Sequence, residues 1–321
     1  MTRILITGAA GMIGRALLAE LAGETGHEVI ATDIAEPRDL PEGATFARMD
    51  VTGTDADASP ASVIAETKPE VIVHLASIVT PPKSMNARTA RDFAHAVDVT
   101  GTQNVLDAAL ANNVRRLVVT SSGAAYGYHA DNSVPLREND PIRGNEEFPY
   151  AHHKRLVEEM LTIARMTNPE LEQVVLRVGT VLGEGTDNQI TALFRRPRLL
   201  AVAGSESPFV FIWTRDLARI LKRAATDGPP GIYNVAGDGA LGVTELANIL
   251  GKPVLRLPAW FLKAALAIAR PLGLSQYGPE QVRFLQYRPV LANDALKRDF
   301  GYTPEKASVE TFEFWRKWAG L

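Results

Sequence analysis

The sequence predicts an α/β protein with a Rossmann-type, doubly wound parallel sheet and a smaller C-terminal substrate-side region. Over the first 178 residues, short apolar runs rich in Val, Ile and Leu alternate with helical patterns, and a glycine-rich turn follows the first run. Such runs are typical of strands that are buried on both faces of a parallel sheet. Their alternation with helices predicts a sheet that is covered by helices on both sides.

The elements can be placed in order along the chain. Strands are expected at Arg3–Thr7, Glu28–Thr32, Thr45–Arg48, Val71–Leu75, Arg116–Thr120 and Gln173–Arg177, with helices between them at Met12–Ala22, Ala61–Thr67, Val97–Asn112 and Tyr150–Thr167. The alternation then weakens, leaving a helix at Thr214–Ala225, a strand at Gly231–Val235 and helices near Val243–Leu250 and Ala259–Ala269. We therefore assign residues 1–178, rejoined by about 210–240, to a cofactor-binding domain, and residues 179–209 and 241–321 mainly to substrate binding.

Composition excludes several functional classes. A net charge of -3 gives no electrostatic reason to expect nucleic acid or an anionic membrane as a partner. The absence of cysteine excludes disulfides, thiolate metal sites and a cysteine nucleophile. The first residues enter a strand pattern at once, which leaves no room for a signal peptide and favours a cytoplasmic protein. Residues 259–274 are interrupted by Lys263, Arg270 and Pro271 and are too short to span a bilayer, so we expect a packed helix.

The segment TGAAGMIG places Gly8, Gly11 and Gly14 between the first strand and the first helix. Backbone N–H groups of such a turn, together with the helix N-terminus at Met12 and Ile13, can approach a pyrophosphate because no Cβ atom intervenes. In this context the glycines predict a dinucleotide site.

An acidic residue follows at the distance that a dinucleotide site requires. Asp33 ends the second strand, nineteen residues beyond Gly14, where a carboxylate can accept hydrogen bonds from a ribose. The same carboxylate would repel a 2′-phosphate, which favours NAD over NADP. Arg15 and Arg38 are close in sequence and leave the NADP alternative open.

Further segments extend this pattern in order. The glycine spacing is GxxGxxG, and it is followed by MDV at 49–51, HLAS at 74–77, DVTGTQNVLDAA at 98–109, VVTSSGAAYG at 118–127, YAHHK at 150–154 and LRVGTVLG at 176–183. In these segments the chain resembles the extended short-chain dehydrogenase/reductase family, which contains NAD-dependent nucleotide-sugar epimerases and dehydratases. The resemblance is close over about the first 180 residues and loose beyond them.

The resemblance implies roles for several further residues. Asp50 and Val51 would flank the adenine, and Leu75, Ala76 and Ser77 would run beneath the cofactor. The catalytic residues would be Ser122, which orients the reacting oxygen, Tyr150, the acid/base, and Lys154, which also holds the nicotinamide ribose.

The chemistry of the YAHHK segment agrees with that implication. Tyr150 and Lys154 are four residues apart on a predicted helix that starts at Pro149, so both side chains project from one face. A free tyrosine has a pKa of about 10, and a nearby ammonium stabilises its phenolate form. Such a tyrosine can remove a proton from a substrate hydroxyl while hydride leaves the carbon.

The substrate side contains both matches and departures. Substrate contacts are expected from Ser122, Gly123, Tyr128, His129 and Thr180. Dehydratases of the family carry an Asp–Glu pair where this chain has Gly123 and Ala124, so the dehydratase reaction loses its acid and base. Asp98 replaces the usual asparagine, and it either has a role near the cofactor or caps a helix that begins near Val99.

A diphosphate clamp is not evident in the sequence. The segment GSESPFVFIWTRDLA at 204–218 has Glu206, Pro208, Phe209 and Phe211 where nucleotide-sugar enzymes of the family place an arginine. The segment LFRRPRLL contains three further cations, Arg195, Arg196 and Arg198. They either bind a phosphate or belong to a loop that faces solvent. The aromatic residues Phe209, Phe211, Trp213 and Trp260 line a pocket or belong to the core. No metal site is expected, because His152 and His153 are adjacent and point in different directions.

Three functions remain open. The first is an NAD-dependent oxidoreductase that interconverts a secondary alcohol and a ketone on a sugar-like or other small hydroxy compound. The second is a nucleotide-sugar (UDP-hexose) 4-epimerase, which would need the diphosphate clamp, and the third is a non-catalytic NAD-binding regulatory protein. Family analogy also implies a homodimer through the helices near 97–112 and 150–167.

Overall fold

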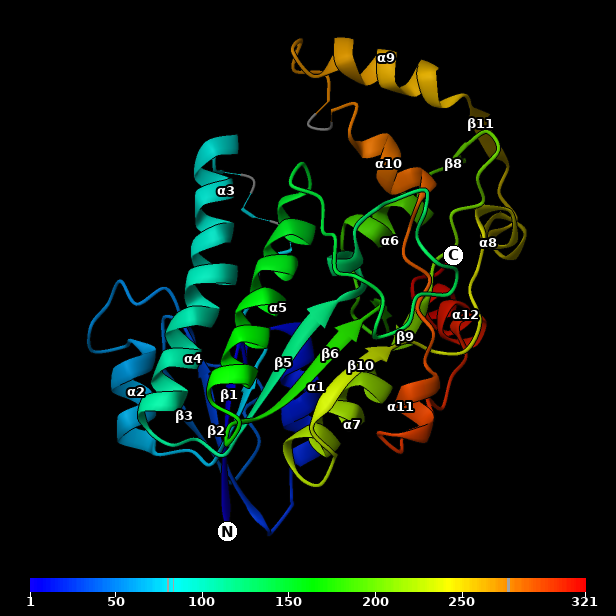
Figure 1. The fold of residues 1–321 in the computed structure, drawn as a ribbon. Coiled ribbons are helices and arrows are strands. Elements are labelled where there is room, and N and C mark those ends of the chain that lie inside the picture. Colours follow the sequence, from blue (N-terminus) through cyan, green and yellow to red (C-terminus); the bar gives the residue numbers. More distant parts are fainter. Residues whose placement is uncertain (80, 83, 276–277) are drawn as a thin grey trace.

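The computed structural model describes residues 1–79, 81–82, 84–275 and 278–321, and it centres on a seven-stranded parallel sheet (Figure 1). The strand order is β3 (Ala44–Arg48), β2 (His27–Asp33), β1 (Thr2–Thr7), β4 (Val71–His74), β5 (Arg116–Ser122), β6 (Glu172–Val178) and β10 (Gly231–Val235). All neighbouring pairs are parallel. The predicted doubly wound sheet is confirmed, and each predicted strand matches within two residues at either end.

Helices cover both faces of this sheet. One face packs against α1 (Met12–Leu21) and α7 (Thr214–Ala225), and the other against α2 (Pro60–Thr67), α4 (Gly101–Ala111) and α5 (Pro149–Thr167). Within β1, Ile4 and Ile6 face the first layer while Leu5 faces the second, and all three are fully buried. Burial on both faces explains why the strands read as continuous apolar runs.

The helix expected from Val97 begins ten residues earlier. It runs through α3 (Ala87–His95), a π-helical segment η1 (Ala96–Thr100) and α4, and the side chain of Asn86 caps it by accepting from the N–H groups of Arg88 and Thr89. The prediction that Asp98 caps a helix is therefore wrong, since Asp98 lies inside the continuous helix. The sequence did not indicate α3 because this helix is largely exposed and polar, with Ala94 as its buried residue.

Smaller elements follow the sheet strand β6. Two parallel pairs form there, β7 (Thr180–Leu182) with β9 (Phe211–Trp213) and β8 (Leu199–Val202) with β11 (Val254–Leu257). Around them lie α6 (Gln189–Phe194), α8 (Val243–Leu250), α10 (Gln281–Gln286), α11 (Asp294–Arg298) and α12 (Ser308–Trp318). The aromatic residues Phe194, Phe211, Phe312 and Trp315 are almost fully buried and form the centre of this part. Phe209, Phe211 and Trp213 are thus core residues.

The apolar segment after β11 forms the predicted helix, α9 (Ala259–Ala269), and this helix packs through one side only. Leu262 is its buried residue, whereas Trp260 is 71% exposed and Ile268 is 63% exposed. In Figure 1, α9 lies far from the central sheet, beyond α10. Apolar residues occur all around this helix, so its contact with Val282 of α10 and Val202 of β8 buries only one side. In the described part of the chain, no helix has the length and apolar character needed to cross a membrane.

Candidate active site

The glycine turn between β1 and α1 approaches its neighbours closely. Gly8 has a φ of +67°, and a Cβ atom there would lie 2.7 Å from the backbone nitrogen of Ala76. A Cβ atom on Gly14 would lie 2.4 Å from the carbonyl oxygen of Gly8. Both positions therefore require glycine, as the tight turn and close packing of a dinucleotide-binding motif demand.

The N-terminus of α1 is suited to an anion. Gly11 is its N-cap residue, and no side chain of the described residues caps the first turn at Met12 and Ile13. A Cβ atom on Gly11 would meet only the Gly8 carbonyl oxygen, at 3.2 Å. Uncapped N–H groups beside a turn of glycine and alanine residues fit a cofactor pyrophosphate.

Asp33 lies directly beside this turn. Its Oδ2 accepts from the N–H of Ala10 at 3.0 Å, and its Oδ1 accepts from the N–H of Ile34 at 2.7 Å. The carboxylate is thus fixed at the end of β2 next to the turn, where a ribose hydroxyl would approach. Arg15 and Arg38, the two cations that left NADP open, both have exposed side chains.

The predicted adenine-side segment after β3 is held by its own hydrogen bonds. Asp50 accepts from the N–H and Oγ1 of Thr52 and from Oγ1 of Thr54. Burial would raise the pKa of the Asp50 carboxyl, but the hydrogen bonds from Thr52 and Thr54 outweigh it and lower that pKa. The carbonyl of Val51 accepts from Nδ2 of Asn104 at 2.9 Å. This segment is therefore fixed against α4.

The segment after β4 is anchored to β1. Thr7 Oγ1 accepts from the N–H groups of Leu75 and Ala76 at 3.2 and 3.3 Å, which brings them against Gly8. Thr7 Oγ1 is also 2.8 Å from Nδ1 of His74, a fully buried ring. Burial, followed by the charge of Lys154, lowers the pKa of His74 to about 3, so this histidine is neutral. Ser77 donates its hydroxyl hydrogen to Asp98 at 2.9 Å.

Tyr150 and Lys154 lie in the first turns of α5, which begins at Pro149 as predicted. Lys154 is buried, and its Nζ donates to the carbonyl oxygen of Thr120 on β5 at 3.0 Å. The same Nζ is 5.6 Å from the centre of the Tyr150 ring. Ser122 ends β5, and its Oγ accepts from the N–H of Ala124 at 3.1 Å in the 3-10 helix η2 (Gly123–Tyr126).

A buried ion pair that we did not predict supports β5 and α5. Glu158 and Arg177 form hydrogen bonds of 2.7 and 3.0 Å, and their side chains are 5% and 4% exposed. Ser121 donates to Glu158 at 2.5 Å, and Arg177 donates to the hydroxyl of Tyr126 at 2.8 Å. Arg177 belongs to the LRVGTVLG segment. A charged residue within a strand that is otherwise apolar was the sequence signal that a buried ion pair could have been predicted from.

The predicted substrate residues occupy different surroundings. The ring of Tyr128 contacts Phe148 and Phe284 edge to face, and burial followed by the nearby Tyr150 raises its pKa. His129 Nε2 is 2.8 Å from the carbonyl oxygen of Arg143, so this ring nitrogen already has a partner.

The remaining two predicted substrate residues, Gly123 and Thr180, contact residues that come later in the chain. A Cβ atom on Gly123 would be 3.2 Å from Leu291, and the N–H of Thr180 in β7 donates to Val210.

One cation near these residues escaped the sequence analysis. The guanidinium of Arg288 lies 3.9 Å from the ring centre of Phe209 and 4.8 Å from that of Phe284, and its Nη1 donates to the carbonyl oxygen of Ser207 at 2.6 Å. Its Nε is buried without a hydrogen-bond partner among the described residues. Burial lowers the pKa of Arg288 to about 9, so it stays charged at neutral pH. Phe209 occupies the segment where nucleotide-sugar enzymes of the family place an arginine, so Arg288 brings a cation to this segment from a distant part of the chain.

The alternative cations lie elsewhere. Arg195, Arg196 and Arg198 follow α6 with exposed side chains, and the guanidinium of Arg195 lies 5.8 Å from the ring centre of Trp315. This arrangement fits a solvated loop.

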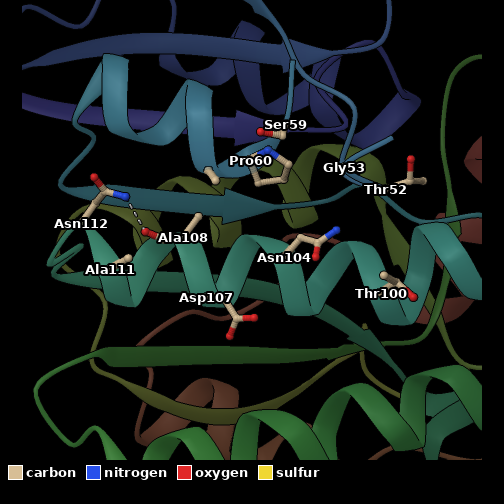
Figure 2. A pocket seen from close by; sticks show the side chains of 11 residues that line it. Thr52, Gly53, Ser59, Pro60, Thr100, Asn104, Asp107, Ala108, Ala111 and Asn112 are labelled. Atoms are coloured by element: carbon tan, nitrogen blue, oxygen red, sulfur yellow. Dashed lines mark hydrogen bonds between the residues drawn. The ribbon is translucent and has the colours of Figure 1, made fainter. Parts of the chain in front are cut away.

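A separate cavity of about 570 Å³ lies between the start of α2 and α4 (Figure 2). Two of its polar side chains are bonded within the chain: Asn104 donates to the carbonyl oxygen of Val51, and Asp107 accepts from Gln103 at 2.7 Å. We assign it no part in the site.

The fold and the glycine turn together define a dinucleotide-binding α/β enzyme. Residues 4–236 match the NAD dependent epimerase/dehydratase family, so the chain belongs to that family and its cofactor is NAD. The predicted family resemblance, the enzyme class and the cofactor are confirmed.

Relatives agree with this assignment. An uncharacterized protein of Mycobacterium tuberculosis is 24% identical over 99% of this chain and 84% of its own length. A UDP-glucose 4-epimerase of Mycolicibacterium smegmatis is 34% identical over 51% of each chain. Among solved structures, the UDP-glucose 4-epimerase of Thermotoga maritima with UDP-glucose superimposes with a TM-score of 0.75 at 19% identity, covering 99% of both chains. The Bordetella bronchiseptica enzyme WbmG with NAD gives a TM-score of 0.73 at 21% identity, covering 99% and 94%.

Proposed function

We propose that this protein transfers a hydride between NAD and a secondary alcohol or ketone of a sugar-like or other small hydroxy compound, with Tyr150 as the acid/base. The main support is the position of Lys154, whose Nζ is held by the Thr120 carbonyl oxygen at 3.0 Å and lies 5.6 Å from the Tyr150 ring. A fixed, buried ammonium beside a tyrosine stabilises its phenolate form.

The roles of the residues follow from this arrangement. When bound, NAD supplies the hydride acceptor. Tyr150 removes the proton of the substrate hydroxyl as the carbon is oxidised, and it returns a proton to the carbonyl oxygen in the reverse direction. Ser122, at the end of β5, orients the reacting oxygen by a hydrogen bond. Asp33 binds the adenosine ribose beside the glycine turn.

A second candidate is the 4-epimerisation of a nucleotide sugar such as a UDP-hexose. The observation that favours it is Arg288, a charged guanidinium with a buried, unpaired Nε close to Tyr128. Such a group can bind a phosphate oxygen with a charge-assisted hydrogen bond. The relatives named as UDP-glucose 4-epimerases support the same substrate class. A non-catalytic NAD-binding role is disfavoured because a pure binder needs no Ser122, Tyr150 and Lys154.

One assay separates the two reactions. The purified protein is incubated with NAD and a panel of UDP-hexoses, free sugars, sugar acids and simple secondary alcohols, and released NADH and product identity are recorded. Net NADH in step with an oxidised product establishes the dehydrogenase. An isomerised UDP-hexose without net NADH establishes the epimerase and refutes the first proposal.

Two variants test the assigned residues in that assay. Tyr150→Phe should lower turnover by about 100-fold or more while leaving the NAD dissociation constant within about twofold, because only the transferable proton is lost. Tyr233→Phe, a buried tyrosine on β10, is the matched control and should keep its activity. Normal turnover of Tyr150→Phe would refute the assignment. Arg288→Met should raise KM for a UDP-hexose about tenfold or more and leave simple alcohols unaffected, with the exposed Arg195→Met as control.

A further inference from the structure

Asp98 is a buried carboxylate that neither proposed reaction uses. Its side chain is 1% exposed and belongs to the π-helical segment η1, where the N–H of Gly101 bonds to the carbonyl oxygen of Ala96, five residues back. π-Helical segments inside α-helices are rare and frequently occur at functional sites. A buried carboxylate is costly unless it is fully hydrogen-bonded, so its partners show what it holds together.

The two oxygens of Asp98 bind two different parts of the site. Oδ1 accepts from the Oγ of Ser77 at 2.9 Å and from the N–H of Ile78 at 2.8 Å, both in the segment after β4 that is predicted to lie beneath the cofactor. Oδ2 lies 3.0 Å from Nδ1 of His153, a buried residue of α5 that directly precedes Lys154. One carboxylate therefore joins the cofactor-side segment to the helical turn that carries the Tyr150–Lys154 pair.

The surroundings of Asp98 are almost fully enclosed. The titratable groups that face this cluster are His153 and Lys154 from α5, His74 from β4 and His95 from α3, whose ring is 5.4 Å from that of His153. His74 is neutral and reaches the backbone of Asp98 through Thr102, which is 3.0 Å from His74 Nε2 and donates to the Asp98 carbonyl at 2.6 Å.

Asp98 is negatively charged in this cluster. Burial would raise the pKa of the Asp98 carboxyl, but the hydrogen bond of His153, the charge of Lys154 and the Ile78 and Ser77 donors outweigh it and lower that pKa. The charges of Asp98 in η1 and Lys154 in α5 therefore attract each other. The family usually has asparagine at position 98, which offers an oxygen acceptor but no charge.

We propose that Asp98 and His153 form a positioning pair, in which the carboxylate fixes the cofactor-side segment against the Tyr150–Lys154 turn and balances the ammonium charge of Lys154. This inference rests on the proposed hydride-transfer function and deepens it. His153 supplies the hydrogen bond that orients the carboxylate toward α5. Both residues act through Lys154 and the Ser77–Ile78 backbone, without contacting substrate.

Asp98→Asn separates the charge from the geometry. Its amide oxygen can accept from Ser77 and Ile78, and its NH₂ group can donate to the Nδ1 of His153 in the other ring tautomer. The variant therefore removes only the charge, and Lys154 then acts on Tyr150 without a balancing anion. The test is a pH titration of the protein–NAD complex that follows the ultraviolet absorbance of tyrosinate, with the signal of the Tyr150→Phe variant subtracted. In Asp98→Asn this absorbance should develop about one pH unit lower than in the unsubstituted protein. A titration that is unchanged or moves to higher pH overturns the charge-balancing role, and a purely structural residue would not produce the predicted shift.

Substitutions of His153 test the hydrogen bond independently. His153→Leu leaves the buried carboxylate without this donor and should raise the NAD dissociation constant, measured by calorimetry, about tenfold. His153→Asn places an amide N–H near the former Nδ1 and should stay within about twofold, as should the neighbouring control His152→Leu. Equal loss in the Leu and Asn variants, or loss in neither, overturns the proposal.

These outcomes are distinguishable from failure of the proposed function. If the unsubstituted protein shows no Tyr150-dependent tyrosinate signal, the acid/base role of Tyr150 is refuted, and the His153 variants still decide the positioning role through NAD affinity. If Asp98→Asn does not fold, the same His153 comparison decides the proposal.

Discussion

Replacing Glu158 by alanine tests whether the ion pair beneath the site stabilises the fold. Glu158 accepts three hydrogen bonds from Arg177, at 2.7, 3.0 and 3.0 Å, and one from Ser121 at 2.5 Å. The substitution leaves the Arg177 guanidinium buried with the Tyr126 hydroxyl and the Glu138 carbonyl as acceptors, and without a counterion. The protein must then keep an unbalanced charge away from water.

The expected cost follows from this burial. Removing one partner of a buried ion pair costs about 3–5 kcal/mol of the free energy of unfolding. Unfolding entropy is about 2.1 cal/mol/K per residue, which for this chain of 321 residues gives about 0.7 kcal/mol/K. The Tm should therefore fall by about 4–8 °C.

Scanning calorimetry measures this shift, and the neighbouring residue provides a matched control. Glu159 is 58% exposed and pairs with Arg155 at 3.6 Å, so Glu159→Ala should cost less than about 0.5 kcal/mol. Replacing both Glu158 and Arg177 by methionine should recover most of the loss, because no unpaired charge remains. The reasoning is refuted if Glu158→Ala unfolds at the same temperature as Glu159→Ala, or if the double variant is as unstable as the single one.

Three further substitutions test the cofactor side. Asp33→Asn should lower the ratio of NAD to NADP affinity about tenfold, since the charge that repels a 2′-phosphate is lost; an unchanged ratio in binding titrations would contradict this. Gly8→Ala should abolish NAD binding, because its Cβ would lie 2.7 Å from a backbone nitrogen. The control is Gly23→Ala, which has a similar φ of +78° but no atom within 4 Å of the added Cβ, and it should bind NAD normally. His74, with its pKa lowered from 6.5 to about 3, stays neutral in the folded state while the unfolded chain takes up a proton. The free energy of unfolding therefore decreases as pH falls from 6.5 toward 3, by up to about 1.4 kcal/mol per pH unit. His74→Asn should remove this part of the pH dependence, measured by urea unfolding. If the two proteins give parallel plots of unfolding free energy against pH, this contribution of His74 is excluded.

The sequence was sufficient for the sheet because its signal is local. The inner strands β1, β4, β5 and β6 are largely buried on both faces, and this burial forces continuous apolar runs that no loop requires. Gly8 and Gly14 were equally readable, since close backbone approaches leave glycine as the residue that fits. The helix at α3 was missed because an exposed, polar helix has no apolar stripe. The exposure of most of α9 was not indicated either, because apolar composition does not say how much partner surface is present.

The site was predictable in part for the same reason. Tyr150 and Lys154 are four residues apart on one helix, so their proximity follows from helix geometry alone. Arg288 could not be inferred in this way, because its contact with Phe209 joins positions 79 residues apart in irregular parts of the chain. The hydrogen bond of Asp98 also involves a distant residue, His153, which lies 55 positions away.

The sequence by itself determined the order of the sheet strands along the chain, the glycine turn, the place of Asp33 at the end of β2 and the proximity of Tyr150 and Lys154, since each follows from a local pattern of residues. Only the tertiary structure decided which partner each buried charged side chain contacts. Asp98 with His153, Glu158 with Arg177 and Arg288 with Phe209 are brought together by the packing of different elements. The physical reason is that hydrogen-bond and charge pairing acts over a few ångströms in space, whereas sequence periodicity reports only the face on which a side chain lies.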